Sequence, residues 1–143
     1  MGQIKSPNQR VELFEKIKKL GKKLPLIVSP KSYISPHSQI GEGTIIMHNV
    51  IINAASTIGN NCIVNTASLI EHDTDINDHC HISTNAIING NCTIKEGTFI
   101  GSNATINQSI SIAKNCIIGS GSLVLKNIIT QNSTWVGNPT IIK

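Results

Sequence analysis

A strict period of six residues runs through most of this chain of 143 residues. Every sixth position between 34 and 124 is Ile or Val: Ile34, Ile40, Ile46, Ile52, Ile58, Val64, Ile70, Ile76, Ile82, Ile88, Ile94, Ile100, Ile106, Ile112, Ile118 and Val124. The residue four positions further on is mostly small: Ser38, Thr44, Val50, Ser56, Cys62, Ser68, Thr74, Cys80, Ala86, Cys92, Thr98, Ala104, Ile110, Cys116 and Ser122. Sixteen aliphatic residues in one uninterrupted register constrain the fold more than any other feature.

Neither the helical period of 3.6 nor the strand period of 2 produces a repeat of six. A triangular coil does, because three short strands, one hexad on each face, complete a turn in eighteen residues. Successive coils then stack about 4.8 Å apart as parallel strands. Gly or Asn often follows the aliphatic residue, and we expect positive φ there: Gly41, Asn53, Gly59, Asn65, Asn77, Asn89, Gly101, Asn107 and Gly119. The repeat therefore predicts an all-β, parallel β-helix of about five coils.

The repeat predicts three segments: a helical segment at 1–32, the β-helix at 33–129 and a closing tail at 130–143. In the first segment, Ser6, Pro7 and Gln9 form a capping-box pattern, and Gly21 is expected to end the helix. Its buried stripe is expected to consist of Val11, Phe14, Ile17 and Leu20. The turn-rich tail contains Gly137, Asn138 and Pro139.

Composition excludes several classes of protein. Aromatic residues make up 3% and charged residues 14% of the chain, which disfavours a helical bundle. Residues 1–32 carry a net charge of +6, but they lack interleaved aromatics or a nucleic-acid-binding motif, so we expect a solvated helix face. The chain has neither a run of about 18 apolar residues nor a signal peptide, and the sequence predicts a cytoplasmic protein without a membrane span.

Side chains just before each inward aliphatic residue must point outward, because strand side chains alternate. Stacked by eighteen, they form three columns: Ile45, Ile63, His81, Phe99 and Ile117; Ile51, Leu69, Ile87, Thr105 and Leu123; Gln39, Thr57, Asp75, Thr93 and Ser111. The first two columns are mainly apolar, and apolar stripes of this length mark interfaces. Two different apolar faces that meet head to tail close into a three-fold ring, so we predict a homotrimer.

His81 interrupts the first apolar column, and His72 lies nine residues earlier at a corner. Nine residues are half a coil, so these imidazoles are expected to meet only between neighbouring subunits. A neutral histidine suits general-base chemistry, and Asp73 could orient the ring of His72. Gly90 follows His72 by one coil in the same column, where the absence of a side chain lets backbone approach a ligand.

The stretch Val64-Asn65-Thr66-Ala67, with Ile70-Glu71-His72-Asp73 and His79-Cys80-His81-Ile82-Ser83, resembles a known family. The hexad pattern is that of left-handed β-helix acyltransferases, and the histidine pattern resembles the sialic acid O-acetyltransferase and bacillosamine-type amino-sugar N-acetyltransferase family. The resemblance implies transfer of an acetyl group from acetyl-CoA to an amino or hydroxyl group of a sugar, for surface glycan synthesis. It implies no metal.

The resemblance also implies roles for individual residues. His72 would be the general base, assisted by Asp73, and Asn65 would contact the sugar. His81 would contact the substrates, including the acetyl donor, and the Gly90 amide would bind the thioester carbonyl. Gly101, Gly119 and Pro139 would contact CoA, with Gly137-Asn138-Pro139 near its adenine. Gly2-Gln3-Ile4 and the following helix resemble the end of the family's N-terminal nucleotide-sugar domain, most of which this sequence lacks.

Other readings of the polar residues stay open. Cys62, Cys80, Cys92 and Cys116 occupy the small inward position and are expected to fill the core. His79 is expected to be a structural turn residue. A γ-class carbonic anhydrase could instead use His72, His79 and His81 as zinc ligands between subunits. A non-catalytic β-helix scaffold is the third hypothesis.

Overall fold

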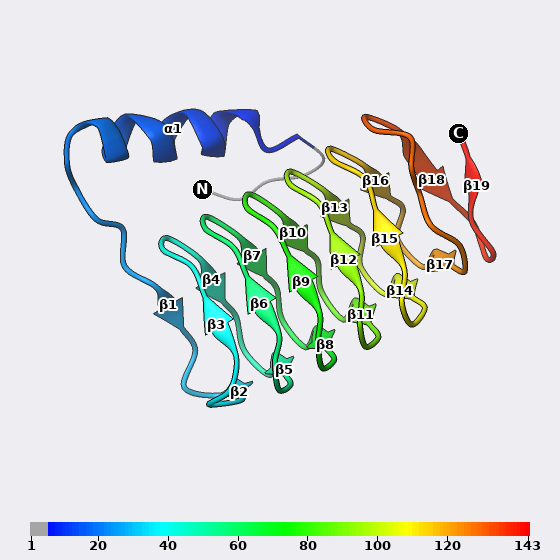
Figure 1. The fold of residues 1–143 in the computed structure, drawn as a ribbon, viewed down its shortest axis with the longest axis horizontal. Helices are drawn as coiled ribbons and strands as arrows, with labels where there is room; N and C mark the ends of the chain where they lie inside the picture. Colours follow the sequence, from blue (N-terminus) through cyan, green and yellow to red (C-terminus); the bar gives the residue numbers. More distant parts are fainter. Residues whose placement is uncertain (1–5) are drawn as a thin grey trace.

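The computed structural model describes residues 6–143, which form a β-helix flanked by one helix (Figure 1). Helix α1 spans Asn8–Lys19. The strands are β1 (Ile27–Val28), β2 (Tyr33–Ile34), β3 (Gln39–Ile40), β4 (Ile45–Ile46), β5 (Ile51–Ile52), β6 (Thr57–Ile58), β7 (Ile63–Val64), β8 (Leu69–Ile70), β9 (Asp75–Ile76), β10 (His81–Ile82), β11 (Ile87–Ile88), β12 (Thr93–Ile94), β13 (Phe99–Ile100), β14 (Thr105–Ile106), β15 (Ser111–Ile112), β16 (Ile117–Ile118), β17 (Leu123–Val124), β18 (Thr134–Val136) and β19 (Ile141–Ile142). The resemblance noted at Gly2-Gln3-Ile4 lies outside the described residues.

Three sheets form the faces of the prism. Sheet A has the order β1-β4-β7-β10-β13-β16-β18-β19, sheet B has β2-β5-β8-β11-β14-β17, and sheet C has β3-β6-β9-β12-β15. Among β1 to β17, every pair is parallel and joins residues eighteen positions apart, as Ile45 with Ile63 and Ile63 with His81. Strand β19 runs antiparallel to β18 and follows the last rung of sheet A. The predicted left-handed parallel β-helix with three hexads per coil is confirmed.

The aliphatic residue of each hexad fills the prism, as the period predicts. From Ile46 to Val124 these side chains are between 0 and 1% exposed. Burying one such side chain contributes about 1.5–3 kcal/mol relative to leaving it in water. At the first coil the equivalent Val28 is 41% exposed, and Ile34 and Ile40 are only partly buried. The hydrophobic core is therefore densest from Ile46 onward.

The coil extends beyond both of the boundaries that the repeat suggested. Strand β1 pairs with β4 upstream of residue 33. At the other end, Ile128 forms a bridge with Ile112, and β18 adds to β16 downstream of residue 129. Upstream, Val28 keeps the hexad register, because it stands six residues before Ile34. Downstream the register is broken: Ile128 follows Ile112 by sixteen residues and Thr134 follows Ile117 by seventeen, which explains why the period alone does not reveal these last rungs.

The left-handed residue of each turn lies three positions after the aliphatic residue, not one. Positive φ angles of 52–62° occur at Asn49, Ala55, Asn61, Ala67, Asp73, His79, Asn85, Asn91, Asn103, Ser109 and Asn115. The expectation of positive φ directly after the aliphatic residue was therefore wrong. Two of the glycines that directly follow the aliphatic residue, Gly41 and Gly101, are needed for a different reason. A Cβ on either would lie 2.6 Å from a backbone nitrogen of the next coil.

The four cysteines line the interior corners of the coil, as predicted. All four are buried with free thiols. The Cys80 thiol donates a hydrogen bond to the Lys95 carbonyl at 3.2 Å, and the Cys92 thiol donates to the Asn107 carbonyl at 3.0 Å. Thr98 uses its hydroxyl in the same way toward Ala113 at 2.9 Å, so thiols and hydroxyls are interchangeable donors that link successive turns. Burial raises the pKa of the Cys80 and Cys92 thiols, which suppresses the reactive thiolate.

We therefore expect none of the four cysteines to react with Ellman's reagent in the native protein. All four should react after unfolding in concentrated guanidinium chloride. The measurement is the absorbance of released thionitrobenzoate in native and denatured samples. A thiol that reacts in native buffer at the rate of free cysteine would contradict this packing.

Helix α1 differs from its predicted form at its N-terminus and agrees with it at its C-terminus. Pro7, not Ser6, is the N-cap residue, and the Ser6 hydroxyl accepts only a long hydrogen bond from the Asn8 amide at 3.4 Å, so the predicted capping box is wrong. The C-terminus is as expected: Gly21 has φ +69°, and the amides of Gly21 and Lys22 donate to carbonyls of the last turn. Phe14 is the buried centre of the predicted stripe, whereas Leu20 is 67% exposed.

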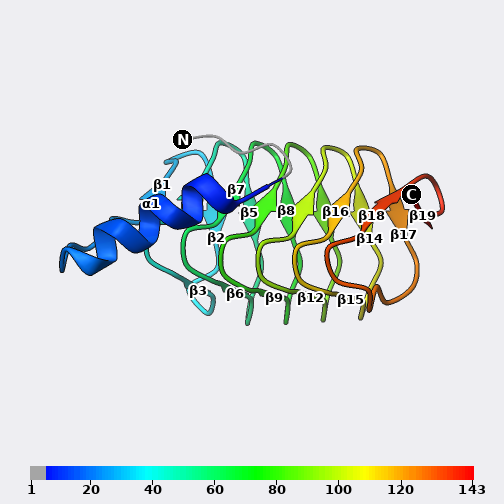
Figure 2. The same cartoon turned by 90° about the horizontal axis from the view of Figure 1, so that it is seen from above.

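Helix α1 runs beside the row of turns that lead from sheet C into sheet A (Figures 1 and 2). It packs over the first rungs of sheet A, and the outward side chain of Ile63 is only 8% exposed. The first apolar column is therefore partly covered within the chain, whereas on sheet B Ile51 is 42% exposed. Within residues 6–143, no helix has both the length and the apolar character that a bilayer span needs.

Candidate functional site

His72 and Asp73 form a polar pair at the corner between strands β8 and β9. His72 Nδ1 lies 2.8 Å from Asp73 Oδ2, and both side chains are about 60% exposed (62% and 60%). A carboxylate accepts hydrogen bonds only, so it favours the tautomer with the proton on Nδ1 and leaves Nε2 as an acceptor. Within the described part of the chain, Nε2 makes no hydrogen bond. The pair therefore has the geometry of an oriented general base.

The backbone conformation of the turn explains why an aspartate is suited to position 73. Asp73 has φ +57°, and its amide donates to the Ala54 carbonyl of the preceding coil at 3.1 Å. Asp and Asn tolerate this left-handed backbone better than most residues. The same coil geometry that closes the turn thus brings the carboxylate beside the imidazole.

Gly90 lies directly against the His72 ring, one coil further along the same corner. A Cβ at Gly90 would lie 2.8 Å from His72 Cε1 and 2.9 Å from Nε2, which is closer than van der Waals contact allows. The ring can occupy its position only because residue 90 is glycine. Among residues 6–143, no hydrogen-bond acceptor is found for the Gly90 amide, so a donor is available beside the imidazole.

His81 lies on β10 in sheet A, on the side of the prism away from the His72 corner. Its side chain is 6% exposed and packs edge-on against Phe99, with ring centroids 5.1 Å apart. The structure thus brings together His72, Asp73 and Gly90 and leaves His81 apart from them within one chain, as the half-coil spacing predicts.

Asn65, Gly101 and Gly119 share one column at the corner between sheets A and B. The Asn65 side-chain oxygen accepts from the Thr66 amide at 2.7 Å. The Gly101 and Gly119 amides each donate to a carbonyl of the next coil at 2.8 Å. Coil stacking alone therefore accounts for these two amides, and contact with CoA stays a prediction.

Pro139, after a cis peptide bond, lines a crevice at the C-terminal end of the coil. Its other walls come from Leu125, Lys126, Asn127, Trp135 and Thr140. This crevice offers an aromatic ring and an ammonium group within one small concavity.

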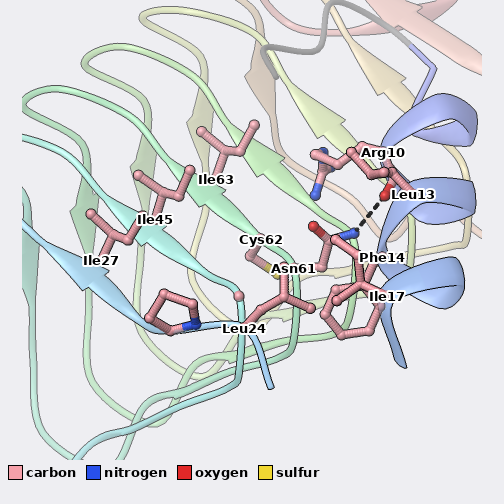
Figure 3. Close-up of a pocket in the computed structure, with 12 residues that line it drawn as sticks. Arg10, Leu13, Phe14, Ile17, Leu24, Ile27, Ile45, Asn61, Cys62 and Ile63 are labelled. Carbon is pink, nitrogen blue, oxygen red and sulfur yellow. Dashed lines mark hydrogen bonds between the residues drawn. The ribbon is translucent and has the colours of Figure 1, made fainter. Parts of the chain in front are cut away.

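Sequence reasoning missed a buried polar cluster beneath helix α1. Arg10 donates from Nη2 to the His79 carbonyl at 2.8 Å, and Asn61 Nδ2 lies 3.0 Å from His79 Nδ1. Figure 3 shows Arg10 and Asn61 beside an apolar crevice whose other walls include Phe14 and Ile63. No local sequence signal could reveal this cluster, because Arg10 and His79 are 69 positions apart. The expectation of a structural role for His79 agrees with these contacts.

Burial lowers the pKa of His79, and the carboxylates of Asp78 and Glu96 oppose this shift only in part. Burial thus favours the neutral His79 ring in the folded chain. Its effect on the free energy of unfolding is fully favourable above about pH 6.5, the pKa of histidine in the unfolded chain. That stability is lost as the pH falls through the lowered pKa of His79 in the folded chain. We expect His79→Asn to reduce the acid dependence of the free energy of unfolding, since Asn tolerates the φ of +62° found there. Urea unfolding of both proteins between about pH 5 and 8 measures this difference. Equal pH slopes would contradict it.

The described residues include no group of three or more His, Cys, Asp or Glu side chains that could hold a metal ion. His79 Nδ1 faces Asn61, and its ring packs edge-on against Phe14 at 5.6 Å. His79, one of the three histidines that the zinc hypothesis requires, is therefore already engaged by Asn61 and Phe14.

Comparison with known proteins identifies the family. Residues 91–126 match the family described as bacterial transferase hexapeptide (six repeats). The acetyltransferase domain of PglB from Neisseria gonorrhoeae is 30% identical, with a TM-score of 0.94 over 98% of this chain and 68% of that one. The chain belongs to the hexapeptide-repeat sugar acetyltransferase family. PerB from Caulobacter crescentus, solved with CoA and GDP-perosamine, is 28% identical, with a TM-score of 0.93 over 98% of this chain and 67% of that one.

WeeI from Acinetobacter baumannii is a third member with this architecture, at 29% identity and a TM-score of 0.92 over 98% of this chain and 68% of that one. A perosamine N-acetyltransferase of Caulobacter crescentus is covered over 66% of its length, so the chain spans about two-thirds of these relatives. A comparison with curated protein sequences found no significant match.

Proposed function

We propose that this protein transfers an acetyl group from acetyl-CoA to an amino or hydroxyl group of a sugar used in surface glycan synthesis. The observation that carries the proposal is the imidazole of His72, oriented by Asp73 at 2.8 Å and seated on the backbone of Gly90. Proton acceptor and amide donor lie side by side there, as acyl transfer requires.

In the proposed reaction, the acceptor nitrogen or oxygen attacks the thioester carbonyl while His72 Nε2 removes its proton. Negative charge develops on the carbonyl oxygen, and the Gly90 amide donates a hydrogen bond to it. The carbon–sulfur bond then breaks, and the departing thiolate of CoA receives the proton from His72. The transfer is direct and needs no acyl-enzyme intermediate.

A homotrimer would complete the site. Because His72 and His81 lie on different sides of the prism, one His72 can meet only the His81 of a neighbouring copy. The outward face of sheet B supplies an apolar surface, which includes Ile51 at 42% exposure and the half-buried Leu69 and Ile87. Head-to-tail packing of this face on sheet A of the next subunit would place the site at the boundary.

Acetyl-CoA is the proposed donor because the PglB domain has been solved with acetyl coenzyme A. The adenine of CoA would stack in the crevice between Trp135 and Pro139, with Lys126 near its phosphates. Gly101 and Gly119 would let the pantetheine arm approach the coil. His81 would contact the acetyl end of the donor.

The acceptor is proposed to be a nucleotide-linked amino sugar or a sialic-acid-type sugar, with Asn65 among its contacts. PerB was solved with GDP-perosamine, which supports the first class.

The proposal is tested by incubating the purified chain with acetyl-CoA and a panel of nucleotide amino sugars and sialic acids. Release of CoA is followed with Ellman's reagent, for which the protein's own buried cysteines give no background, and the product is identified by mass spectrometry. Stoichiometric zinc together with hydration of CO2 to bicarbonate would favour the carbonic anhydrase instead. Tight acetyl-CoA binding without turnover on any sugar would favour a scaffold.

A further inference from the structure

Helix α1 holds the turn that leads into β10, the strand of His81. The Arg10 guanidinium is buried at 8% exposure and donates from Nη2 to the His79 carbonyl at 2.8 Å. His79 has φ +62° and precedes His81 by two residues. One charged side chain of the helix is therefore attached directly to the backbone that positions His81.

A second set of contacts fixes the same turn from the coil side. Asn61 Nδ2 donates to the Arg10 carbonyl at 3.3 Å and lies 3.0 Å from His79 Nδ1. Phe14 packs edge-on against the His79 ring at 5.6 Å, one turn along the helix from Arg10. The backbone and side chain of His79 are thus both held by α1 and by the preceding coil.

Burying a guanidinium is unfavourable unless hydrogen bonds offset its lost hydration, and in some proteins a buried charge specifies one geometry. The ion pair between Lys18 of α1 and Glu42, at 2.6 Å, lies at the surface and joins the helix to a turn far from β10. Surface contacts of this kind can attach α1 to the coil, so a buried charge at the turn before His81 is not needed for attachment.

We infer that Arg10 is a positioning residue for His81, acting through the carbonyl of His79. Loss of the guanidinium leaves that carbonyl without its donor, and the turn relaxes toward solvent. His81, which packs on Phe99 at 5.1 Å, then shifts relative to the rest of sheet A. This role rests on the proposed function only for its catalytic consequence, and the shift of His81 can be measured without substrate.

The experiment compares Arg10→Met, which keeps the aliphatic stem, with Arg10→Lys, which keeps one donor. Lys18→Met is the matched control, because it removes a charged contact from the same helix away from His81. The first readout is the His81 ring resonance in protein labelled with ¹³C at histidine Cε1, assigned by its loss in His81→Asn. The second is the dissociation constant for acetyl-CoA, measured by calorimetry, together with kcat and KM.

We expect the His81 resonance to move in Arg10→Met, to return partly in Arg10→Lys and to stay in place in Lys18→Met. Acetyl-CoA should bind about tenfold more weakly to Arg10→Met, with KM raised more than kcat is lowered. An unmoved His81 resonance in folded Arg10→Met would overturn the inference. If Arg10→Met does not fold, Arg10→Gln, whose shorter side chain also lacks the guanidinium, takes its place, and an unmoved His81 resonance in that folded variant would overturn the inference equally.

The two proposals fail in different ways. If the unmodified chain does not bind acetyl-CoA, the proposed function fails while the resonance shifts still decide the role of Arg10. If the unmodified chain binds acetyl-CoA and Arg10→Met binds it equally well, the positioning role fails and the proposed function stands.

Discussion

Replacing His72 by alanine is expected to reduce acetyl transfer by about 10²- to 10⁴-fold in kcat, the usual contribution of a positioned general base. The side chain is 62% exposed at a corner, so its removal costs little packing and the fold should survive. The measurement is initial rate at saturating acetyl-CoA and acceptor, with unfolding temperature and oligomeric state recorded on the same sample.

His37→Ala is the matched control for that variant. His37 is exposed on the first coil, two coils before Asp73 on the same edge, and its described hydrogen bonds use its backbone only: the amide donates to the Ser35 hydroxyl and the carbonyl accepts from the Ala55 amide. Removing its side chain therefore breaks none of these bonds. Its rate should equal that of the unmodified protein. Full activity in His72→Ala would remove this imidazole as the base and return the site to the rival hypotheses.

Gly90→Ala is expected to have the second largest effect, a loss in kcat of about 10²-fold, although it adds one methyl group. The new Cβ would lie 2.8 Å from His72 Cε1, so the ring must leave its position over the backbone. Because the displaced group is an exposed side chain, the unfolding temperature should change little. Activity and thermal unfolding of the same preparation separate these two effects.

A double variant makes the interpretation of Gly90 stricter. If Gly90→Ala acts by displacing His72, then adding it to His72→Ala should cause no further loss, because coupled residues do not behave additively. Gln108→Ala, one coil further along the same exposed corner, serves as the control and should leave kcat unchanged. Independent, multiplicative losses in the double variant would show that Gly90 acts apart from the imidazole.

The hexad period determined the coil because each strand is only two residues long and carries one inward side chain. Once Ile46, Ile52 and Ile58 must all be buried, the eighteen-residue pairing follows, and the structure shows it throughout β1 to β17. The same argument placed Gly90 one coil above His72. The proximity of those two residues was therefore predictable from spacing alone.

Local backbone details were less predictable. The sequence suggested positive φ at residues such as Gly41, but coil stacking uses that glycine for a 2.6 Å approach and places the left-handed residue elsewhere in the turn. The capping pattern at Ser6 failed because the helix begins only after Pro7. In both cases two local arrangements suit the same residue types, and contacts with other parts of the chain select one.

The sequence by itself determined the periodic part of this protein: the three-sided coil, its aliphatic core and the alignment of His72 with Gly90. These features repeat at fixed intervals, so the burial of one coil specifies the next. Only the tertiary structure decided where α1 packs, that Arg10 reaches the turn of His79, and that sheet A is partly covered. Those contacts join segments with no common period, and their energy depends on shape and burial that no spacing encodes.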